Sequence, residues 1–105
     1  MCSLAAAFVC GGCVGRTVSI PSPDGTTVLN ARVATDAADP PPLNCVILDF
    51  VDMASHETFS VNTHASNVMR WDVAWASNTR VALMSSDIGE TFWDKQADGT
   101  WKRAK

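Results

Sequence analysis

The feature that most constrains the fold of this chain is a series of short segments in which apolar and polar residues alternate, separated by turn residues. In residues 70–76, Trp71, Val73 and Trp75 fall on one face, and in residues 79–85, Val81 and Leu83 do the same. A period of two residues is typical of strands with one buried face. Because short turns join these segments, the sequence predicts an all-β fold, a single small antiparallel β-meander or sandwich domain.

Further segments complete a set of about six to eight predicted strands, namely residues 16–20, 26–35, 44–51, 58–63, 91–95 and the region of Trp101. In residues 26–35, Val28, Ala31 and Val33 do not share one parity, which predicts a bulge or a twist. The nearly continuous apolar run at 44–51 predicts a central strand covered on both faces. Residues 64–69 are ambiguous, and one short helix there is the alternative to further strand.

The turn signals are specific. Residues 21–25 read Pro-Ser-Pro-Asp-Gly, a turn begun by proline and closed by glycine. The three prolines at 40–42 cannot donate to a sheet ladder, so we expect residues 36–42 to form an extended loop. Residues 97–99, Ala-Asp-Gly, predict a hairpin turn leading into Trp101.

The first fifteen residues carry no charged side chain. The apolar run at 4–9 is shorter than the roughly 20 residues that a membrane span needs, and it lies where the hydrophobic region of an export signal lies. With Gly11, Gly12 and Cys13 after it, the segment resembles a bacterial lipoprotein signal, in which the cysteine is acylated. The resemblance implies a leader at 1–13, lipidation at Cys13 and a β-rich domain at 14–105; a buried N-terminal strand or helix is the alternative.

The cysteines also suggest metal or thiol chemistry, because Cys10 and Cys13 have the C-x-x-C spacing. A structural zinc site needs four ligands, and Cys45, His56 and His64 are not at paired ligand spacing. Cys45, inside an apolar run, is expected to be a small buried hydrophobic residue. The sequence therefore predicts no metal and no cofactor.

Four carboxylates gather near the C-terminal hairpin, at Asp87, Glu90, Asp94 and Asp98. Their spacing does not match the Asp-x-Asp-x-Asp-Gly pattern of calcium loops. We therefore interpret them as turn-forming and solubilising residues, with calcium binding as the alternative.

Two short motifs resemble β-propeller blades. Ser22-Pro23-Asp24-Gly25 is similar to the turn of TolB-type blades, and Trp71-Asp72 is similar to the W-D pair of other blades. Asp-Gly-Thr occurs at 24–26 and again at 98–100, which suggests two turns of like chemistry. The resemblance implies a strand meander with propeller-like turns, and the chain is long enough for at most two four-stranded blades.

The tryptophans are the candidate binding surface. Trp71 and Trp75 share one face and could stack on a sugar or a peptide, although core packing is the favoured interpretation because each ring can bury about 150 to 250 Å². Trp93 and Trp101 flank the 97–99 turn, and we expect them to be partly exposed and to pair across the hairpin.

A net charge of −3 offers no basic field for nucleic acid, and Lys102, Arg103 and Lys105 are expected to form a solvated tail. No nucleophile elbow and no glycine-rich phosphate loop is present, so a non-enzymatic role is expected.

The leading hypothesis is an envelope protein anchored in the inner or outer membrane or secreted, whose β-domain contacts another envelope protein or a cell-wall component. The alternative is a periplasmic ligand-binding or inhibitor module that uses an aromatic or acidic turn surface, and an enzyme ranks third.

Overall fold

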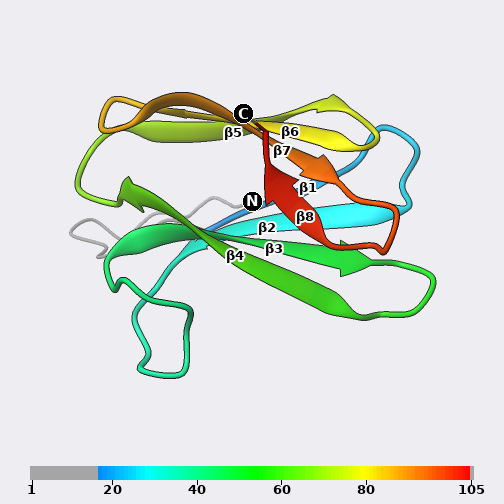
Figure 1. Cartoon of the computed structure of the whole chain (residues 1–105), viewed down its shortest axis with the longest axis horizontal. Coiled ribbons are helices and arrows are strands. Elements are labelled where there is room, and N and C mark those ends of the chain that lie inside the picture. The colour runs from blue at the N-terminus through cyan, green and yellow to red at the C-terminus, as the bar shows by residue number, and fades with distance from the viewer. Residues whose placement is uncertain (1–16, 105) are drawn as a thin grey trace.

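The computed structural model describes residues 17–104, which form two antiparallel sheets of four strands each. The strands are β1 (Val18–Pro21), β2 (Thr27–Val33), β3 (Cys45–Asp52), β4 (Thr58–Ser66), β5 (Trp71–Ser77), β6 (Arg80–Ser85), β7 (Gly89–Lys95) and β8 (Trp101–Arg103). In each sheet the strands follow one another in chain order, so each sheet is a simple meander. The sheets lie as two layers: in Figure 1, β2, β3 and β4 lie below β5, β6 and β7, and β8 descends from the upper layer toward the lower one.

The all-β prediction is confirmed, and residues 17–104 contain no helix. The helical turn considered for residues 64–69 does not form, because β4 continues to Ser66 and a turn follows directly. His64 has a φ of 66° inside this strand, where the register between β3 and β4 shifts. A bulge therefore absorbs the irregular pattern that made this segment ambiguous.

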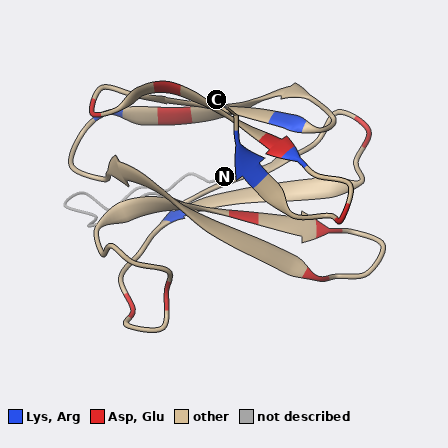
Figure 2. Ribbon diagram, in the orientation of Figure 1, with Lys and Arg blue, Asp and Glu red and all other residues tan. Residues whose placement is uncertain are grey.

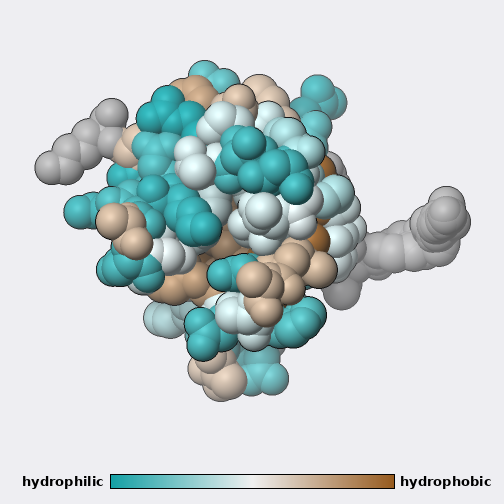
Figure 3. All heavy atoms as spheres, turned by 90° about the vertical axis from the view of Figure 1, so that its right-hand side faces the viewer, coloured by the Kyte–Doolittle hydropathy of each residue, from teal (hydrophilic) through white to brown (hydrophobic). Residues whose placement is uncertain are grey.

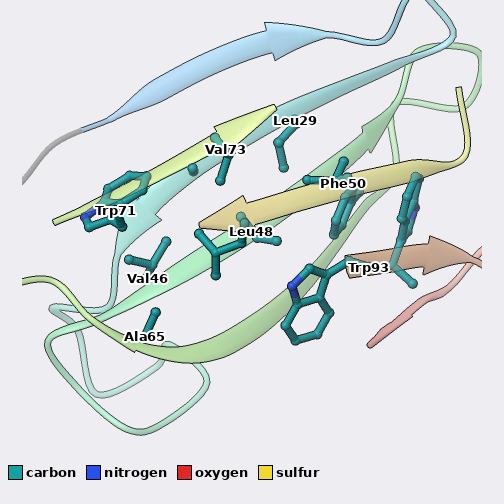
Figure 4. Close-up of a cluster of buried hydrophobic side chains, with 12 residues drawn as sticks. Leu29, Val46, Leu48, Phe50, Ala65, Trp71, Val73 and Trp93 are labelled. Atoms are coloured by element: carbon teal, nitrogen blue, oxygen red, sulfur yellow. The ribbon is translucent and has the colours of Figure 1, made fainter. Parts of the chain in front are cut away.

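One hydrophobic core joins the two layers. Its buried members come from both sheets (Figure 4): Leu29, Ala31, Val46, Leu48, Phe50, Ala65, Trp71, Val73, Val81, Leu83, Trp93 and Trp101. The predicted alternation of apolar and polar residues directs these side chains into the core. In β6, for example, Val81 and Leu83 are fully buried, whereas the neighbouring Met84 is 45 % exposed. Neither sheet could bury its apolar face without the other, so the two meanders form one domain.

Residues 26–35 were predicted to contain a bulge or a twist, and the bulge is absent from β2. β2 pairs with β1 and with β3 without any shift of register. Leu29, Ala31 and Val33 alternate with half-buried residues and face the core, so Leu29 sets the parity. Val28 belongs to the opposite face, and counting it with the core residues is what made the pattern look irregular.

β3 is an interior strand covered on both faces, as its apolar run predicted. Val46, Ile47 and Leu48 are consecutive and fully buried. On the outer face, Asn62 of β4 lies opposite Ile47 and donates hydrogen bonds of 2.8 Å to the carbonyl oxygens of Pro40 and Pro42. The proline-containing loop between β2 and β3 is thereby held against this face of the sheet.

The two Asp-Gly-Thr turns have the same internal bonding. In the turn between β1 and β2, Asp24 Oδ1 accepts hydrogen bonds from the backbone nitrogen and the hydroxyl of Thr26. In the turn between β7 and β8, Asp98 Oδ1 accepts the same pair from Thr100. The intervening glycines have φ values of 74° and 87°, which side-chain-bearing residues rarely adopt.

Hydrogen bonds also link the two layers. Three such bonds of 2.9 Å run from Trp75 Nε1 to the Ile20 carbonyl, from the Asp24 nitrogen to Asn78 Oδ1, and from the Ser66 nitrogen to Asp87 Oδ2. They connect edge strands and turns, which contribute less to the shared core. The relative position of the sheets is therefore fixed at both ends of the sandwich.

The proposed leader, with Cys10 and Cys13, lies outside the described residues. Within residues 17–104, no helix has the length and apolar character needed to cross a membrane.

Candidate binding cleft

Most of the tryptophan set is core. Trp71, Trp93 and Trp101 are 3 %, 6 % and 4 % exposed, and Trp75 is half-buried against the same core. The expectation that Trp93 and Trp101 are partly exposed is wrong, because both face the inner side of the second sheet. They also do not pair with each other, since Trp93 lies opposite Arg103 and Trp101 lies opposite Lys95.

Trp101 is the centre of an aromatic cluster between the layers. Its ring stacks on Phe50 of β3 with ring centroids 4.0 Å apart and an interplanar angle of 4°. Trp75 of β5 meets it edge-on, with centroids 5.8 Å apart and an angle of 75°. One face of the Trp101 indole is therefore covered by Phe50, and the ring cannot serve as an open stacking platform.

A cleft opens beside this cluster, where the β3–β4 hairpin of one sheet meets the β7–β8 hairpin of the other. We call it the hairpin cleft; its volume is about 280 Å³. Its lining comprises Thr27, Phe50, Asp52, Glu57, Thr58, Phe59, Lys95, Asp98, Gly99, Thr100 and Trp101. Figure 3 views this end of the molecule and shows hydrophobic surface bordered by hydrophilic side chains.

Local turn chemistry holds the two walls of the cleft. At the end of β3, Asp52 Oδ1 accepts a hydrogen bond from the Ala54 nitrogen, and the Asp52 carbonyl accepts one from the His56 nitrogen. His56 has a φ of 63°, which turns the chain back into β4. On the other wall, the Asp98 turn and a bond of 2.7 Å from the Gln96 nitrogen to the Thr100 carbonyl close the β7–β8 hairpin.

The cleft is acidic. Three carboxylates line it, from Asp52, Glu57 and Asp98, against a single ammonium group from Lys95. Figure 2 shows acidic residues at the end of β3, the start of β4 and the β7–β8 turn. The two hydrogen bonds from Thr100 hold the pKa of Asp98 below its ordinary value, so this carboxylate is charged at neutral pH.

The other acidic residues near the C-terminal hairpin do not join the cleft. Asp87 bonds the Ser66 nitrogen, and Asp94 forms an ion pair of 2.6 Å with Arg80. The four carboxylates considered for calcium are thus dispersed. Among residues 17–104, no group of three or more histidine, cysteine or acidic residues could hold a metal ion.

Among the described residues considered for metal or thiol chemistry, His56, His64 and Cys45 do not belong to the lining of the cleft. His56 and His64 are exposed, in a turn and at the β4 bulge. Cys45 is a half-buried free cysteine at the start of β3, and its partial burial raises the pKa of the thiol. A raised thiol pKa disfavours the reactive thiolate.

A second hollow of about 350 Å³ lies at the opposite end of the second sheet. Its lining comes from β5, β6, β7 and their connections: Arg70, Trp71, Asp72, Met84, Ser85, Ser86, Gly89 and Glu90. Unlike the hairpin cleft, it belongs to one sheet alone.

Sequence reasoning did not find the hairpin cleft. Phe59 and Glu57 stand about forty residues before Asp98 and Trp101 in the chain, and only the packing of the two sheets brings these hairpins together. The available signals were Trp101, a candidate binding residue from the sequence that does line the cleft, and the Asp-Gly-Thr turn at 98–100. Comparison with family models, with curated proteins and with solved structures finds no match.

Proposed function

We propose that this chain is a small non-enzymatic binding domain whose ligand site is the hairpin cleft. The observation that carries the proposal is a cleft whose lining combines three aromatic residues, Phe50, Phe59 and Trp101, with carboxylates and threonines. Ligand sites are usually concave and combine apolar surface with polar groups that orient the ligand; in this cleft the polar share is large. The volume of about 280 Å³ suits a small molecule or a single side chain of a larger partner.

A chemical-shift screen of the full chain against mixed small molecules tests this proposal. We expect ligands to shift the amide signals of Phe59, Thr100 and Trp101. Thr58→Trp, which fills the cleft from the start of β4, should abolish these shifts. Thr79→Trp, in the exposed β5–β6 turn, should leave them unchanged. Ligand shifts that survive Thr58→Trp would contradict the assignment of the site.

We further propose that the domain is delivered to the cell envelope and held there by acylation of Cys13. The support is the uncharged first fifteen residues ending in Gly-Gly-Cys-Val-Gly. In this arrangement the anchored domain presents the hairpin cleft to another envelope protein or to a cell-wall component on the periplasmic side.

Metabolic labelling with a fatty acid in a bacterial host tests the anchor. Cys13→Ser should lose the label and leave the membrane fraction, whereas Cys10→Ser, three residues earlier, should keep both. Equal labelling of the two variants, or an intact Met1 on the mature protein by mass spectrometry, would contradict this proposal.

A further inference from the structure

We infer that the ligand of the hairpin cleft carries an alkylammonium group, as a diamine or a lysine side chain does. The inference rests on the proposed function and adds the chemical class of the ligand.

The charge of the lining favours a cation. Three carboxylates and one lysine belong to the lining, and no ion pair joins Lys95 to any of these carboxylates within the described chain. The carboxylates are thus not neutralised by neighbouring protein groups. A site with an excess of negative charge raises the local concentration of cations and repels anions.

The carboxylates differ in how far they are already engaged. Asp98 accepts two hydrogen bonds from Thr100, and Asp52 accepts one from Ala54. The carboxylate of Glu57 forms no hydrogen bond or ion pair with any of residues 17–104, and Glu57 is exposed. Glu57 is therefore the carboxylate with all its acceptor capacity available for an ammonium group.

Phe59 is the aromatic residue of the lining that is best placed to contact the methylene chain of such a ligand, because Phe50 and Trp101 are almost fully buried. Phe59 is half-buried and lines the cleft, so part of its ring is available for apolar and cation–π contact. A sugar would need a broad open ring, but Phe50 covers a face of Trp101, which is only 4 % exposed. This limited aromatic exposure favours a narrow alkyl chain over a flat pyranose.

Titration of the 15N-labelled full chain with three matched probes tests this inference. The probes are 1,5-diaminopentane, the neutral 1,5-pentanediol and the anionic glutarate, all of one chain length. The diamine should shift Phe59, Thr100 and Trp101 in a saturable manner, with the diol weaker and glutarate inactive. A lysine-containing tripeptide, compared with the diamine, distinguishes a protein side chain from a free amine as the source of the ammonium group.

Two variants make the test specific. Glu57→Gln should weaken diamine binding by about two- to fivefold, the range expected for one partly solvated charge pair. Glu90→Gln makes the same change on β7, outside the lining of the cleft, and should leave binding unchanged. Both residues are exposed, so neither variant should impair folding.

The outcomes separate the two proposals. If the diol or a methyl glucoside binds in the cleft as tightly as the diamine, the ammonium inference is wrong while the binding site stands. If the diamine produces no saturable shift, the inference is also overturned, and the mixed screen decides on the site independently. Equal effects of Glu57→Gln and Glu90→Gln would likewise contradict it.

Discussion

At the residue scale, Trp101 connects the core to the candidate site. Its indole stacks on Phe50, meets Trp75 edge-on and lines the hairpin cleft. One side chain from the short strand β8 thus bridges the two sheets. The shape of the cleft therefore depends on the same packing that stabilises the domain.

Replacement of Trp101 should be costly. Trp101→Ala removes a large side chain that is 4 % exposed, and we expect the free energy of unfolding to fall by about 3 to 5 kcal/mol. Met84→Ala, at a residue that is 45 % exposed, should change it by no more than about 0.5 kcal/mol. Urea denaturation followed by circular dichroism measures both. Similar losses for the two variants would contradict the central role of Trp101.

The aspartates of the two Asp-Gly-Thr turns should titrate at acidic pH, and the amide signals of the threonines that bond them should follow this titration. Hydrogen bonds from Thr26 and Thr100 lower the pKa values of Asp24 and Asp98 below the ordinary value of 3.8. Because the folded-state pKa values are depressed, the stabilisation is present above the unfolded-state pKa values and is lost as pH falls through the folded ones. We therefore expect the amide signals of both threonines to shift only below about pH 4.

Asp98→Asn supplies the control for this pH dependence. Asparagine keeps an oxygen acceptor but cannot titrate, so the Thr100 amide should no longer follow pH in this range. The Thr26 amide should still titrate in the same sample, because Asp24 is unchanged. A Thr100 signal that still follows pH in the variant would show that another group is responsible.

At the scale of elements, the sheet-facing loop between β2 and β3 is held by two sets of contacts. Asn62 donates to the carbonyls of Pro40 and Pro42, and Arg32 bridges Asp39 in the loop and Asp49 on β3. The Arg32–Asp49 contact is 2.6 Å and the Arg32–Asp39 contact is 2.9 Å. These polar contacts allow a loop to cover the apolar Ile47 side of the sheet.

Asn62→Ala should release this loop. Loss of two hydrogen bonds, a part-buried one to the Pro40 carbonyl and an exposed one to the Pro42 carbonyl, is expected to lower the free energy of unfolding by about 1 to 3 kcal/mol. Amide hydrogen exchange should accelerate in residues 35–44 and remain unchanged in β6 and β7, which lie in the other sheet. Unchanged exchange in the loop would mean that the ion pairs alone hold it.

The local pattern of apolar and polar residues predicted the strands well, because the formation of each strand depends mainly on residues that are neighbours in the chain. β5 and β6 alternate as expected, and the apolar run of β3 is an interior strand. The errors arose where a local pattern has two physical solutions. Residues 64–66 continue a strand through a bulge, and Trp93 and Trp101, which flank a turn, face inward because the other sheet covers them.

The candidate cleft could not be predicted in this way. Its two walls are hairpins from different sheets, and nothing in either segment specifies that they meet. The four carboxylates near the C-terminal hairpin illustrate this as well, because their spacing in the chain does not show which of them reach the cleft. Asp94 pairs with Arg80 and Asp87 bonds Ser66, so only Asp98 of that group reaches the cleft.

At the scale of the whole molecule, the two sheets should unfold together, because they share one core and are linked by hydrogen bonds at both ends. All four tryptophans lie in the second sheet, so their fluorescence reports that layer, whereas amide signals of β2 and β3 report the first. We expect one midpoint in urea for both probes. Two separated midpoints would show that each meander is an independent unit.

The central claim is that the open end of this sandwich, between the β3–β4 and β7–β8 hairpins, is a binding site. Its most direct test is a set of intermolecular nuclear Overhauser effects between the methylenes of bound 1,5-diaminopentane and the protein. The account predicts contacts to the ring protons of Phe59 and Trp101. Contacts instead to Met84, in the hollow at the other end of the second sheet, would contradict it.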